Sequence, residues 1–336
     1  MLALLSGFIA EFLLGDQYLS GFEPAGEQVT SFILFVAFYG MAAVLIRELA
    51  RRLRLGWTGI LLLALGYGIF EEGLITQSLF NPHYLGLSLI EPGYIPVLGI
   101  GAPWTIFVIS LHVVWSISSP IAITEAWYGR GDPERAVRPW LGRAGVVVCL
   151  VIFGLAAAAT AAFSVASDPH RFVAPPARLI ITALAVGAAI VLAVRLRGRQ
   201  PTPAQPTARA AVVSAALVTV AASLFEILDN LGGLSPWLRT AALAAIWAVV
   251  LVILSAWRRR GSTVVPPGPA AFGLAAGAVL TYCWVGLVSS LDAGVPGVIE
   301  QSVLVIIMLA ILAWTTRRSL ARSAPRSLPA QSPALS

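Results

Sequence analysis

The sequence has few of the residues that soluble proteins carry on their surfaces. It contains no lysine, and charged residues make up 11% of its 336 positions, against about 25% in an ordinary soluble domain. Its two cysteines, Cys149 and Cys283, both lie inside apolar runs, which excludes a disulfide framework and a cysteine-rich metal site. Hydrophobic residues, in contrast, reach 58%, and the mean hydropathy is +0.86. The composition therefore predicts a polytopic membrane protein.

Long apolar runs recur along the whole chain and predict an all-α, polytopic transmembrane helical bundle. A bilayer core about 30 Å thick needs about 20 helical residues per crossing. Candidate crossings occupy residues 2–19, 29–49, 57–80, 103–124, 144–166, 177–196, 209–229, 236–257, 269–290 and 297–316. Gly15 and Asp16 interrupt the first run. The sequence thus predicts about ten helices, or nine crossings if residues 2–19 do not span.

All basic residues of the chain are arginines, and they give it a net charge of +6. No basic groove interleaved with aromatic residues is present, so we expect no nucleic-acid partner. The arginines cluster between apolar runs, as cytoplasmic loops do. With both termini inside, only Arg171, Arg178 and Arg239 fall on the outer side. We therefore expect a multi-pass protein of a bacterial plasma membrane, with both termini cytoplasmic and membrane lipids as partners.

A proline-rich stretch divides the chain. Residues 197–208 predict a cytoplasmic linker between a six-helix membrane half, residues 1–196, and a four-helix membrane half, residues 209–316. Residues 317–336 are rich in Ser, Pro, Ala and Arg and predict a disordered cytoplasmic tail.

Two smaller patterns concern contacts of the helices. Arg47, Arg51 and Arg54 recur at helical spacing, which favours an anchor for anionic lipids. Gly273 and Gly277 form a GxxxG pattern, which predicts a packing seam either within the chain or between the protomers of an oligomer.

Two adjacent carboxylates, Glu71 and Glu72, lie inside the third apolar run. One charged carboxylate at mid-bilayer costs about 2.5–3.5 kcal/mol on insertion scales, so the pair would cost roughly 5–7 kcal/mol. Adjacent carboxylates also repel each other, and at least one should keep its proton near neutral pH. The run must therefore bury these groups against protein or water.

The fourth run offers a partner for the carboxylates. One helical face of this run carries a polar stripe, made of Thr105, His112, Ser116 and Ser119. At 1.5 Å per residue, Glu72 lies ~12 Å from the outer end of its helix and His112 lies ~13.5 Å from the outer end of its own. The two residues should therefore lie at similar depth in the outer half of the membrane.

The helical faces of the third run predict that its two carboxylates have different neighbours. Tyr67, Glu71 and Ser78 share one face and Glu72 shares the next with Thr76, so we expect one carboxylate to face His112 and the other a different neighbour. The predicted ligand- or proton-binding residues are Glu71, Glu72, His112, Tyr67, Thr76 and Ser116. We expect no metal ion and no cofactor, because no Walker loop, HExxH or CxxC pattern is present.

Two resemblances accompany this pattern. The stretch from Gly66 to Leu74, with Gln77 to Pro82 and His112 to Ser116, resembles a group of uncharacterised polytopic bacterial membrane proteins over about the first 145 residues. A Glu-Glu pair followed by a His on the next helix is also similar to the CPBP (CAAX-type) intramembrane proteases, although Thr76 stands where that family has an arginine. This second resemblance implies that the carboxylates activate a water molecule and that the histidine supports the oxyanion or the base.

Three functions remain compatible with the sequence. We favour transport or small-ligand handling through a protonatable intramembrane cavity formed by Glu71, Glu72 and His112, because ionisable groups inside a membrane usually serve function. The first alternative is a CPBP-like intramembrane protease, with the same three residues as its catalytic groups. The second is a non-catalytic membrane scaffold, in which the polar cluster only locks the helices together.

Overall fold

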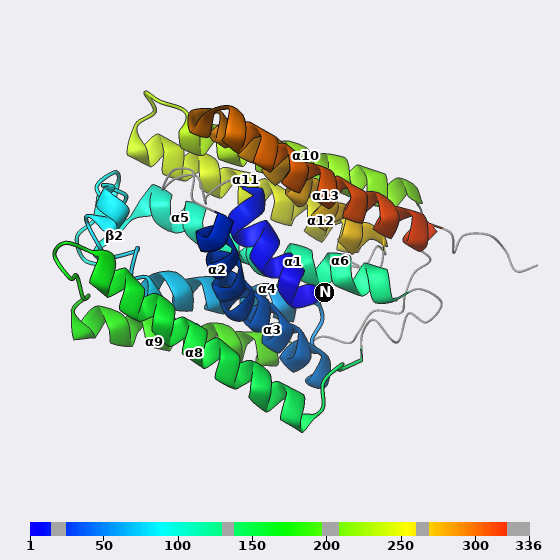
Figure 1. Cartoon of the computed structure of the whole chain (residues 1–336), viewed down its shortest axis with the longest axis horizontal. Helices are drawn as coiled ribbons and strands as arrows, with labels where there is room; N and C mark the ends of the chain where they lie inside the picture. Colours follow the sequence, from blue (N-terminus) through cyan, green and yellow to red (C-terminus); the bar gives the residue numbers. More distant parts are fainter. Residues whose placement is uncertain (15–24, 130–137, 197–207, 260–268, 321–336) are drawn as a thin grey trace, which may run out of the picture.

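The fold is an all-α transmembrane bundle (Figure 1). A computed structural model describes residues 1–14, 25–129, 138–196, 208–259 and 269–320. Nearly all of the predicted linker and most of the predicted tail lie outside the described residues. The division into two membrane halves therefore stays a prediction.

The described helices up to Tyr128 repeatedly change from the α-helical to the wider π-helical geometry. In chain order they are α1 (Leu2–Gly7), the π-helix η1 (Phe8–Leu13), α2 (Ala25–Phe35), the π-helix η3 (Val36–Gly40), α3 (Met41–Arg52), α4 (Trp57–Phe70), the π-helix η4 (Glu71–Ile75), α5 (Ala102–Leu111), the π-helix η6 (His112–Ser118) and α6 (Ser119–Tyr128).

The remaining described helices are regular. They are α8 (Arg143–Ser167), α9 (Pro176–Arg195), α10 (Ala208–Asn230), α11 (Pro236–Arg259), α12 (Pro269–Ser289) and α13 (Gly294–Leu320), with the 3₁₀ turn η7 (Ser290–Ala293) between the last two. These bounds lie within a few residues of the predicted runs.

Among the described residues, eight apolar helical segments are long enough to cross a membrane. The last of them, Ala270–Arg318, contains the η7 turn and so consists of α12 and α13. The apolar helix Leu2–Leu13 is shorter, about 18 Å at 1.5 Å per residue, and does not span a 30 Å core by itself.

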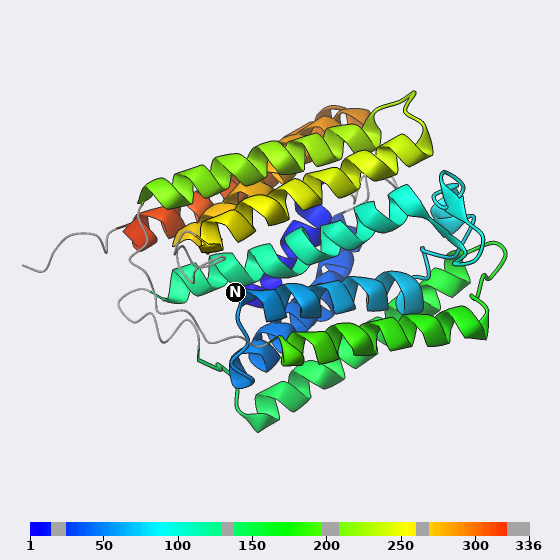
Figure 2. The ribbon, with the colours of Figure 1, turned by 180° about the vertical axis from the view of Figure 1, so that it is seen from behind.

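The helices are arranged in three groups. In Figure 1, α10 to α13 lie along one side, α8 and α9 along the opposite side, and α1 to α6 between them. Figure 2 shows the continuous rod of α5, η6 and α6 running between α4 and α11. The outer helices turn large apolar side chains outward, as Leu155, Leu184 and Val252 show with exposed fractions of 68%, 68% and 67%. A soluble protein does not expose such faces, whereas lipid covers them in a membrane.

The C-terminal helices pack directly on the central rod. The Trp115 ring stacks on Tyr282 with centroids 4.5 Å apart, and its Nε1 donates to the carbonyl of Ala278 at 2.7 Å. On α11, Trp247 Nε1 donates to Ser110 Oγ at 2.8 Å. Residues far apart in the sequence therefore share one apolar core.

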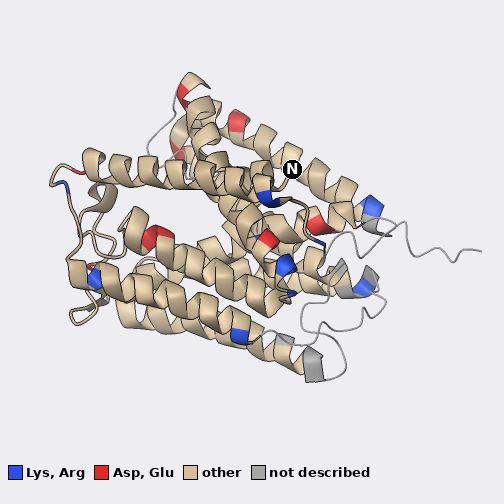
Figure 3. Ribbon diagram, turned by 90° about the horizontal axis from the view of Figure 1, so that it is seen from below, with Lys and Arg blue, Asp and Glu red and all other residues tan. Residues whose placement is uncertain are grey.

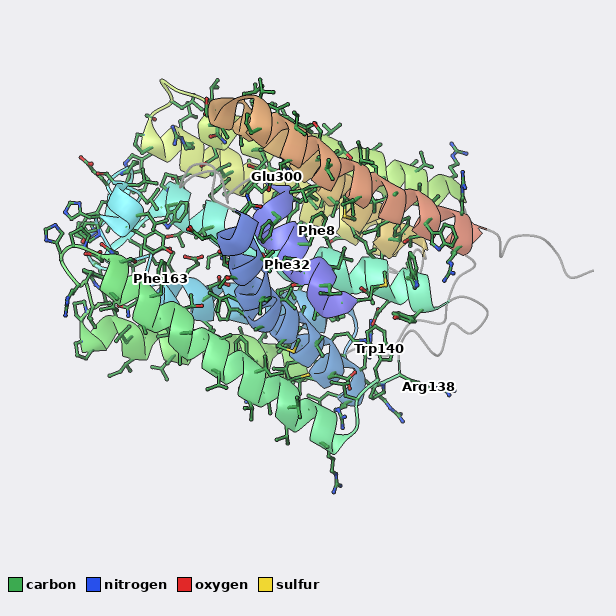
Figure 4. All side chains as sticks on the ribbon, in the orientation of Figure 1. Phe8, Phe32, Arg138, Trp140, Phe163 and Glu300 are labelled. Atoms are coloured by element: carbon green, nitrogen blue, oxygen red, sulfur yellow. The ribbon has the colours of Figure 1, made fainter. Side chains whose placement is uncertain are left out.

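One end of the bundle carries most of the arginines (Figure 3), but two of them do not face lipid. Arg47 and Arg51 are buried and both donate to the Glu125 carboxylate, Arg47 at 3.2 Å and Arg51 at 2.7 and 2.5 Å. Arg47 also pairs with Glu48 at 3.0 Å and lies 3.4 Å from the centre of the ring of Trp140, a residue labelled in Figure 4. The predicted lipid anchor is therefore wrong for these two residues, because Glu125 of α6 pairs with both inside the bundle and Glu48 of the same helix pairs with Arg47.

The GxxxG pattern of α12 lies at a helix–helix contact within the chain. A Cβ added to Gly273 would lie 2.2 Å from the Ala211 carbonyl oxygen, and one on Gly277 would lie 2.3 Å from that of Ala215. Both glycines thus allow α12 to pack backbone to backbone against α10. The seam is internal, which is one of the two alternatives that the sequence left open.

The end of the bundle opposite the arginine-rich end is capped by irregular segments. A short hairpin pairs β1 (Tyr94–Ile95) with β2 (Ile100–Gly101), in the antiparallel register of Tyr94 opposite Gly101. Asn81, after η4, donates to Asp168, after α8, at 2.5 Å. This bond joins the two segments that follow η4 and α8.

Candidate functional site

The imidazole of His112 lies between the two predicted carboxylates. Its Nε2 is 2.6 Å from Oε1 of Glu72, and its Nδ1 is 3.2 Å from Oε2 of Glu71. The exposed fractions of Glu71, Glu72 and His112 are 1%, 6% and 5%. An acidic pair and an imidazole are therefore joined in one buried cluster inside the membrane-spanning part of the chain.

The contact of both carboxylates with one ring differs from the prediction that only one would face His112. The reason is local geometry, because the chain is π-helical from Glu71 to Ile75 and the face assignment assumed 100° per residue. The helix then ends, and Gln77 adopts a left-handed conformation with φ of 57°. The extra residue in the turn and the sharp ending together reorient the side chains.

The ending of this helix also brings new partners to Glu72. Its Oε2 accepts hydrogen bonds from Thr76 Oγ1 at 3.1 Å and from the Ser78 hydroxyl. Ser78 in turn accepts a hydrogen bond from Trp104 Nε1 at 3.2 Å. A chain of polar contacts thus runs from His112 through Glu72 and Ser78 to Trp104, near the N-terminal end of α5.

Aromatic side chains enclose the histidine. The Tyr39 ring stacks on the His112 ring with centroids 5.9 Å apart, and the Tyr67 ring meets it edge to face at 6.0 Å. Ser116 Oγ lies 3.5 Å from His112 Nδ1. All six predicted site residues therefore lie in one place, and Tyr39 joins them from η3.

Glu11 is the acidic group of this site that the sequence analysis missed. It lies on η1, beside Tyr39, and is close enough to His112 and Glu72 to interact with them electrostatically. Close packing brings it there, since a Cβ on Gly40 of η3 would lie 2.5 Å from the carbonyl oxygen of Ala3. The signal was present in the sequence, because Glu11 interrupts an apolar run just as Glu71 does.

Each π-helix in the described residues carries a member of this cluster. Glu11 lies on η1, Tyr39 on η3, the glutamate pair on η4 and His112 on η6. π-Helices are rare and occur frequently at functional sites, since the widened turn costs helix stability. Four such turns around one cluster point to a site under functional constraint.

Two polar atoms of the cluster have unused hydrogen-bonding capacity. Oε2 of Glu71, besides its contact with His112, and the hydroxyl of Tyr67 are buried without a hydrogen bond of ordinary geometry, although Tyr67 lies beside the Glu71 carboxyl. Buried polar atoms are normally hydrogen-bonded, and exceptions mark a place for a water molecule, an ion or a functional role. The cluster is therefore able to take up one more small polar group or a proton.

The donor set also fits a cation in composition. Glu71, Glu72 and His112 each offer one ligand atom, and these atoms lie within 4.8 Å of one another. However, the 2.6 Å separation of Nε2 and Oε1 is a hydrogen-bond distance. Adjacent ligands around a tetrahedral zinc ion would be about 3.3 Å apart, from metal–ligand distances near 2.0 Å. The arrangement of these three side chains is therefore that of a hydrogen-bonded network.

The contacts of His112 permit two proton arrangements. If the ring is neutral, one nitrogen donates and the other accepts, so one of Glu71 and Glu72 must carry a proton to complete both contacts. If the ring is protonated, both nitrogens donate and both carboxylates are ionised. The two arrangements hold the same number of protons, so a proton can pass between a carboxyl and the ring without a change in the charge of the cluster.

Comparison with known proteins identifies the family but not an activity. Searches of curated proteins and of solved structures found no match, and the resemblance to CPBP proteases is not shown. A family model described as an uncharacterized membrane protein family matches residues 1–329, well beyond the first 145 residues that carry the resemblance in the sequence. The protein is thus a multi-pass membrane protein, and it belongs to this uncharacterized membrane protein family.

Proposed function

We propose that this protein transports protons, coupled to a small polar solute, and that Glu71, His112 and Glu72 form the proton-carrying site. The observation that carries the proposal is the position of the His112 ring, with one nitrogen facing each carboxylate at 3.2 and 2.6 Å. A ring bridging two carboxylates can receive a proton on one side and release it on the other. Ionisable residues inside a membrane are typical of such relays.

Other groups around the ring set the charge of the site. Glu11 approaches from η1, and the hydroxyls of Tyr39 and Tyr67 lie beside the acidic groups. With the ring protonated and both carboxylates of the pair ionised, the three central groups carry one negative charge. Uptake of one more proton makes them neutral, which removes the penalty for holding charge in an apolar surrounding.

The contacts also suggest a direction of access. Glu72, Ser78 and Trp104 form a polar chain toward the end of α5 that carries the β1–β2 hairpin. Protons or a polar solute would enter from this end, and a change in the protonation of Glu72 would alter its bonds to Thr76 and Ser78. We therefore expect protonation to shift the segment that follows η4.

The experiment measures charge movement, which does not require that the solute be identified. Proteoliposomes containing the full chain are adsorbed on a solid-supported membrane and exposed to a pH jump. We expect wild type to displace charge, and Glu72→Gln to reduce the displacement to the level of protein-free liposomes. Glu226→Gln is the matched control, because Glu226 is also a buried carboxyl but lies outside the cluster on α10.

Folding of each variant is checked by thermal unfolding and gel filtration, and Glu71→Gln serves as a second variant. Equal charge displacement in wild type, Glu71→Gln and Glu72→Gln would overturn the proposal. Cleavage of a membrane peptide that is lost in Glu71→Ala would instead favour the protease alternative. Loss of thermal stability alone, in Glu71→Gln and His112→Ala, would favour the scaffold.

A further inference from the structure

A second feature is an apolar cavity of about 470 Å³, whose lining shares no residue with the Glu–His cluster of Glu71, Glu72 and His112. Its walls come from α4, from η6 and α6, and from α10, α11 and α12. In Figure 2 the central rod can be followed between α4 and α11, which form two of the walls. The volume falls in the range of roughly 300–1,000 Å³ that is typical of ligand pockets.

The cavity opens to the surroundings of the bundle rather than being sealed in the core. Thr58 of α4 and Leu251 of α11 line it and are exposed. Because both helices belong to the membrane-spanning part, the surroundings at this opening are lipid. A molecule that enters therefore comes from the bilayer.

The lining of the cavity on α4 is about as long as the hydrocarbon part of one leaflet is thick. On α4 its lining runs from Trp57, at the arginine-rich end, to Leu65. Eight residues at 1.5 Å each give about 12 Å. Half of a hydrocarbon core about 30 Å thick is about 15 Å. Along α4, counted from its arginine-rich end, the lining is thus nearly as long as the hydrocarbon part of one leaflet.

Two buried hydrogen-bonding groups that line the cavity lack partners, Trp57 at its arginine-rich end and Ser118 farther along the central rod. Trp57 and Ser118 both line the cavity, and their exposed fractions are 8% and 9%. Trp57 Nε1 and Ser118 Oγ make no hydrogen bond with the described residues. An unpaired buried donor costs about 1–3 kcal/mol, so these groups indicate an oxygen-bearing ligand next to an otherwise apolar space. Arg54, three residues before Trp57, is exposed at the same end.

We infer that this cavity binds one acyl chain of a membrane phospholipid from the leaflet at the arginine-rich end. The methylene chain fills the apolar part between α4 and α11. The ester oxygens at the top of the chain accept hydrogen bonds from Trp57 Nε1 and Ser118 Oγ. The nearby Arg54 suits the phosphate of the same lipid.

The test uses a photoreactive lipid. The full chain is reconstituted in vesicles of phosphatidylethanolamine and phosphatidylglycerol, with part of the phosphatidylglycerol carrying a diazirine in one acyl chain. After illumination, peptide mass spectrometry locates the adducts. We expect adducts on the cavity-lining parts of α4, η6 and α11, and saturation of this labelling as the photoreactive fraction rises.

Variants separate the cavity from the general lipid-facing surface. Ala221→Phe fills the cavity, since Ala221 lines it on α10, and should abolish the saturable labelling. Ala188→Phe is the matched control, because Ala188 is exposed on α9, and should leave the labelling unchanged. Ser118→Ala keeps the shape of the cavity but removes a hydrogen-bond donor. It should raise the lipid fraction at half-saturation about fivefold, the equivalent of about 1 kcal/mol.

Thermal unfolding accompanies each variant, and Ala275→Leu provides a second way to fill the cavity. Saturable labelling that persists in both folded filling variants would overturn the inference. A lack of saturable labelling in wild type would overturn it as well, and a higher melting temperature of Ala221→Phe would then identify an empty cavity. None of these outcomes depends on proton transport, because Glu71, Glu72 and His112 do not line the cavity.

Discussion

At the residue scale, the most constrained charges outside the Glu–His cluster are those around Glu125. This carboxylate accepts hydrogen bonds from both Arg47 and Arg51, and all three side chains are buried. Removing one partner of a buried ion pair leaves an uncompensated charge. The group therefore acts as a structural lock between α3 and α6.

We predict that Glu125→Gln lowers the free energy of unfolding by about 3–5 kcal/mol, because two buried guanidinium groups lose their anion. The measurement is thermal and denaturant unfolding in detergent. Glu27→Gln, at a position of α2 outside the core, should shift stability by less than about 0.5 kcal/mol. An equal effect of the two substitutions on the free energy of unfolding would contradict the role of Glu125 in locking α3 to α6.

A second residue-scale prediction concerns the hydrogen bond between Asn81 and Asp168, which joins the segments after η4 and α8. The Asn81 amide donates to Asp168 and holds the pKa of that carboxyl below its usual range. A lowered pKa in the folded state means stability that is present above the ordinary Asp pKa of about 3.9 and is lost as the pH falls through the lower, folded-state value. The protection factors of residues 78–86, which are exchange rates corrected for the intrinsic pH dependence of amide exchange, should therefore fall at acid pH.

The control for this effect is Asp168→Asn, which removes the titrating group. In this variant the protection factors of residues 78–86 should be lower than in wild type at neutral pH and should depend less on pH. The interpretation fails if wild type and variant respond to acid alike.

The sequence identified most of the cluster at this scale but not all of it. Glu71, Glu72 and His112 were recognisable because a charge inside an apolar run is costly, and their matched depth on neighbouring helices was readable from residue counts. Glu11 offered the same signal, but its run is short and was interpreted only as a first helix. Arg47 and Arg51 were misjudged, because the partner Glu125 lies on a distant helix that the sequence does not place.

At the element scale, the feature that builds the site is the set of π-helical turns. Each inserts one residue into a helical turn and changes which side chains face inward. Hydrophobic periodicity at 100° per residue cannot reveal such a change, which explains why Glu71 and Glu72 were assigned to different neighbours. The structure instead directs both toward His112.

The second element-scale feature is the packing of α1 on η3, which brings Glu11 next to Tyr39. We predict that Gly40→Ala lowers stability by about 1–3 kcal/mol, because the new Cβ would lie 2.5 Å from the carbonyl oxygen of Ala3 and α1 must shift. Thermal unfolding measures this effect. Gly154→Ala on α8 has no neighbour within 4 Å and should be neutral or stabilising.

The same pair of variants tests the role of α1 in function. If α1 positions Glu11, Gly40→Ala should also change the charge displaced by a pH jump, whereas Gly154→Ala should not. A Gly40→Ala protein with wild-type stability and wild-type charge displacement would show that this close packing is unimportant.

At the scale of the whole molecule, hydropathy predicted the bundle well. The bounds of α8, α9 and α11 fall within about two residues of the predicted runs, because an apolar helix must match the bilayer thickness. The arrangement of these helices was not predictable, since lipid and protein interior are equally apolar. The close packing of α10 on α12 depends on the small residues at their contact, among them Gly273 and Gly277.

Orientation is a whole-molecule property that the arginine distribution predicts. We propose that the arginine-rich end faces the cytoplasm, as positive loops do. Alkaline phosphatase inserted after Gly93 should then be active, and green fluorescent protein fused after Ser336 should fluoresce. The opposite pattern in an expressing bacterium would reverse the direction of proton entry proposed above.

The central claim is that His112 shares protons with both Glu71 and Glu72. The chain has only three histidines, so replacing His83 and His170 by Gln leaves His112 as the single imidazole for nitrogen-15 solid-state NMR in lipid bilayers. We predict that both ring nitrogens report hydrogen bonds, and that Glu71→Gln and Glu72→Gln each shift a different nitrogen and alter its response to pH. A ring that titrates like a free imidazole, unaffected by either substitution, would contradict the account.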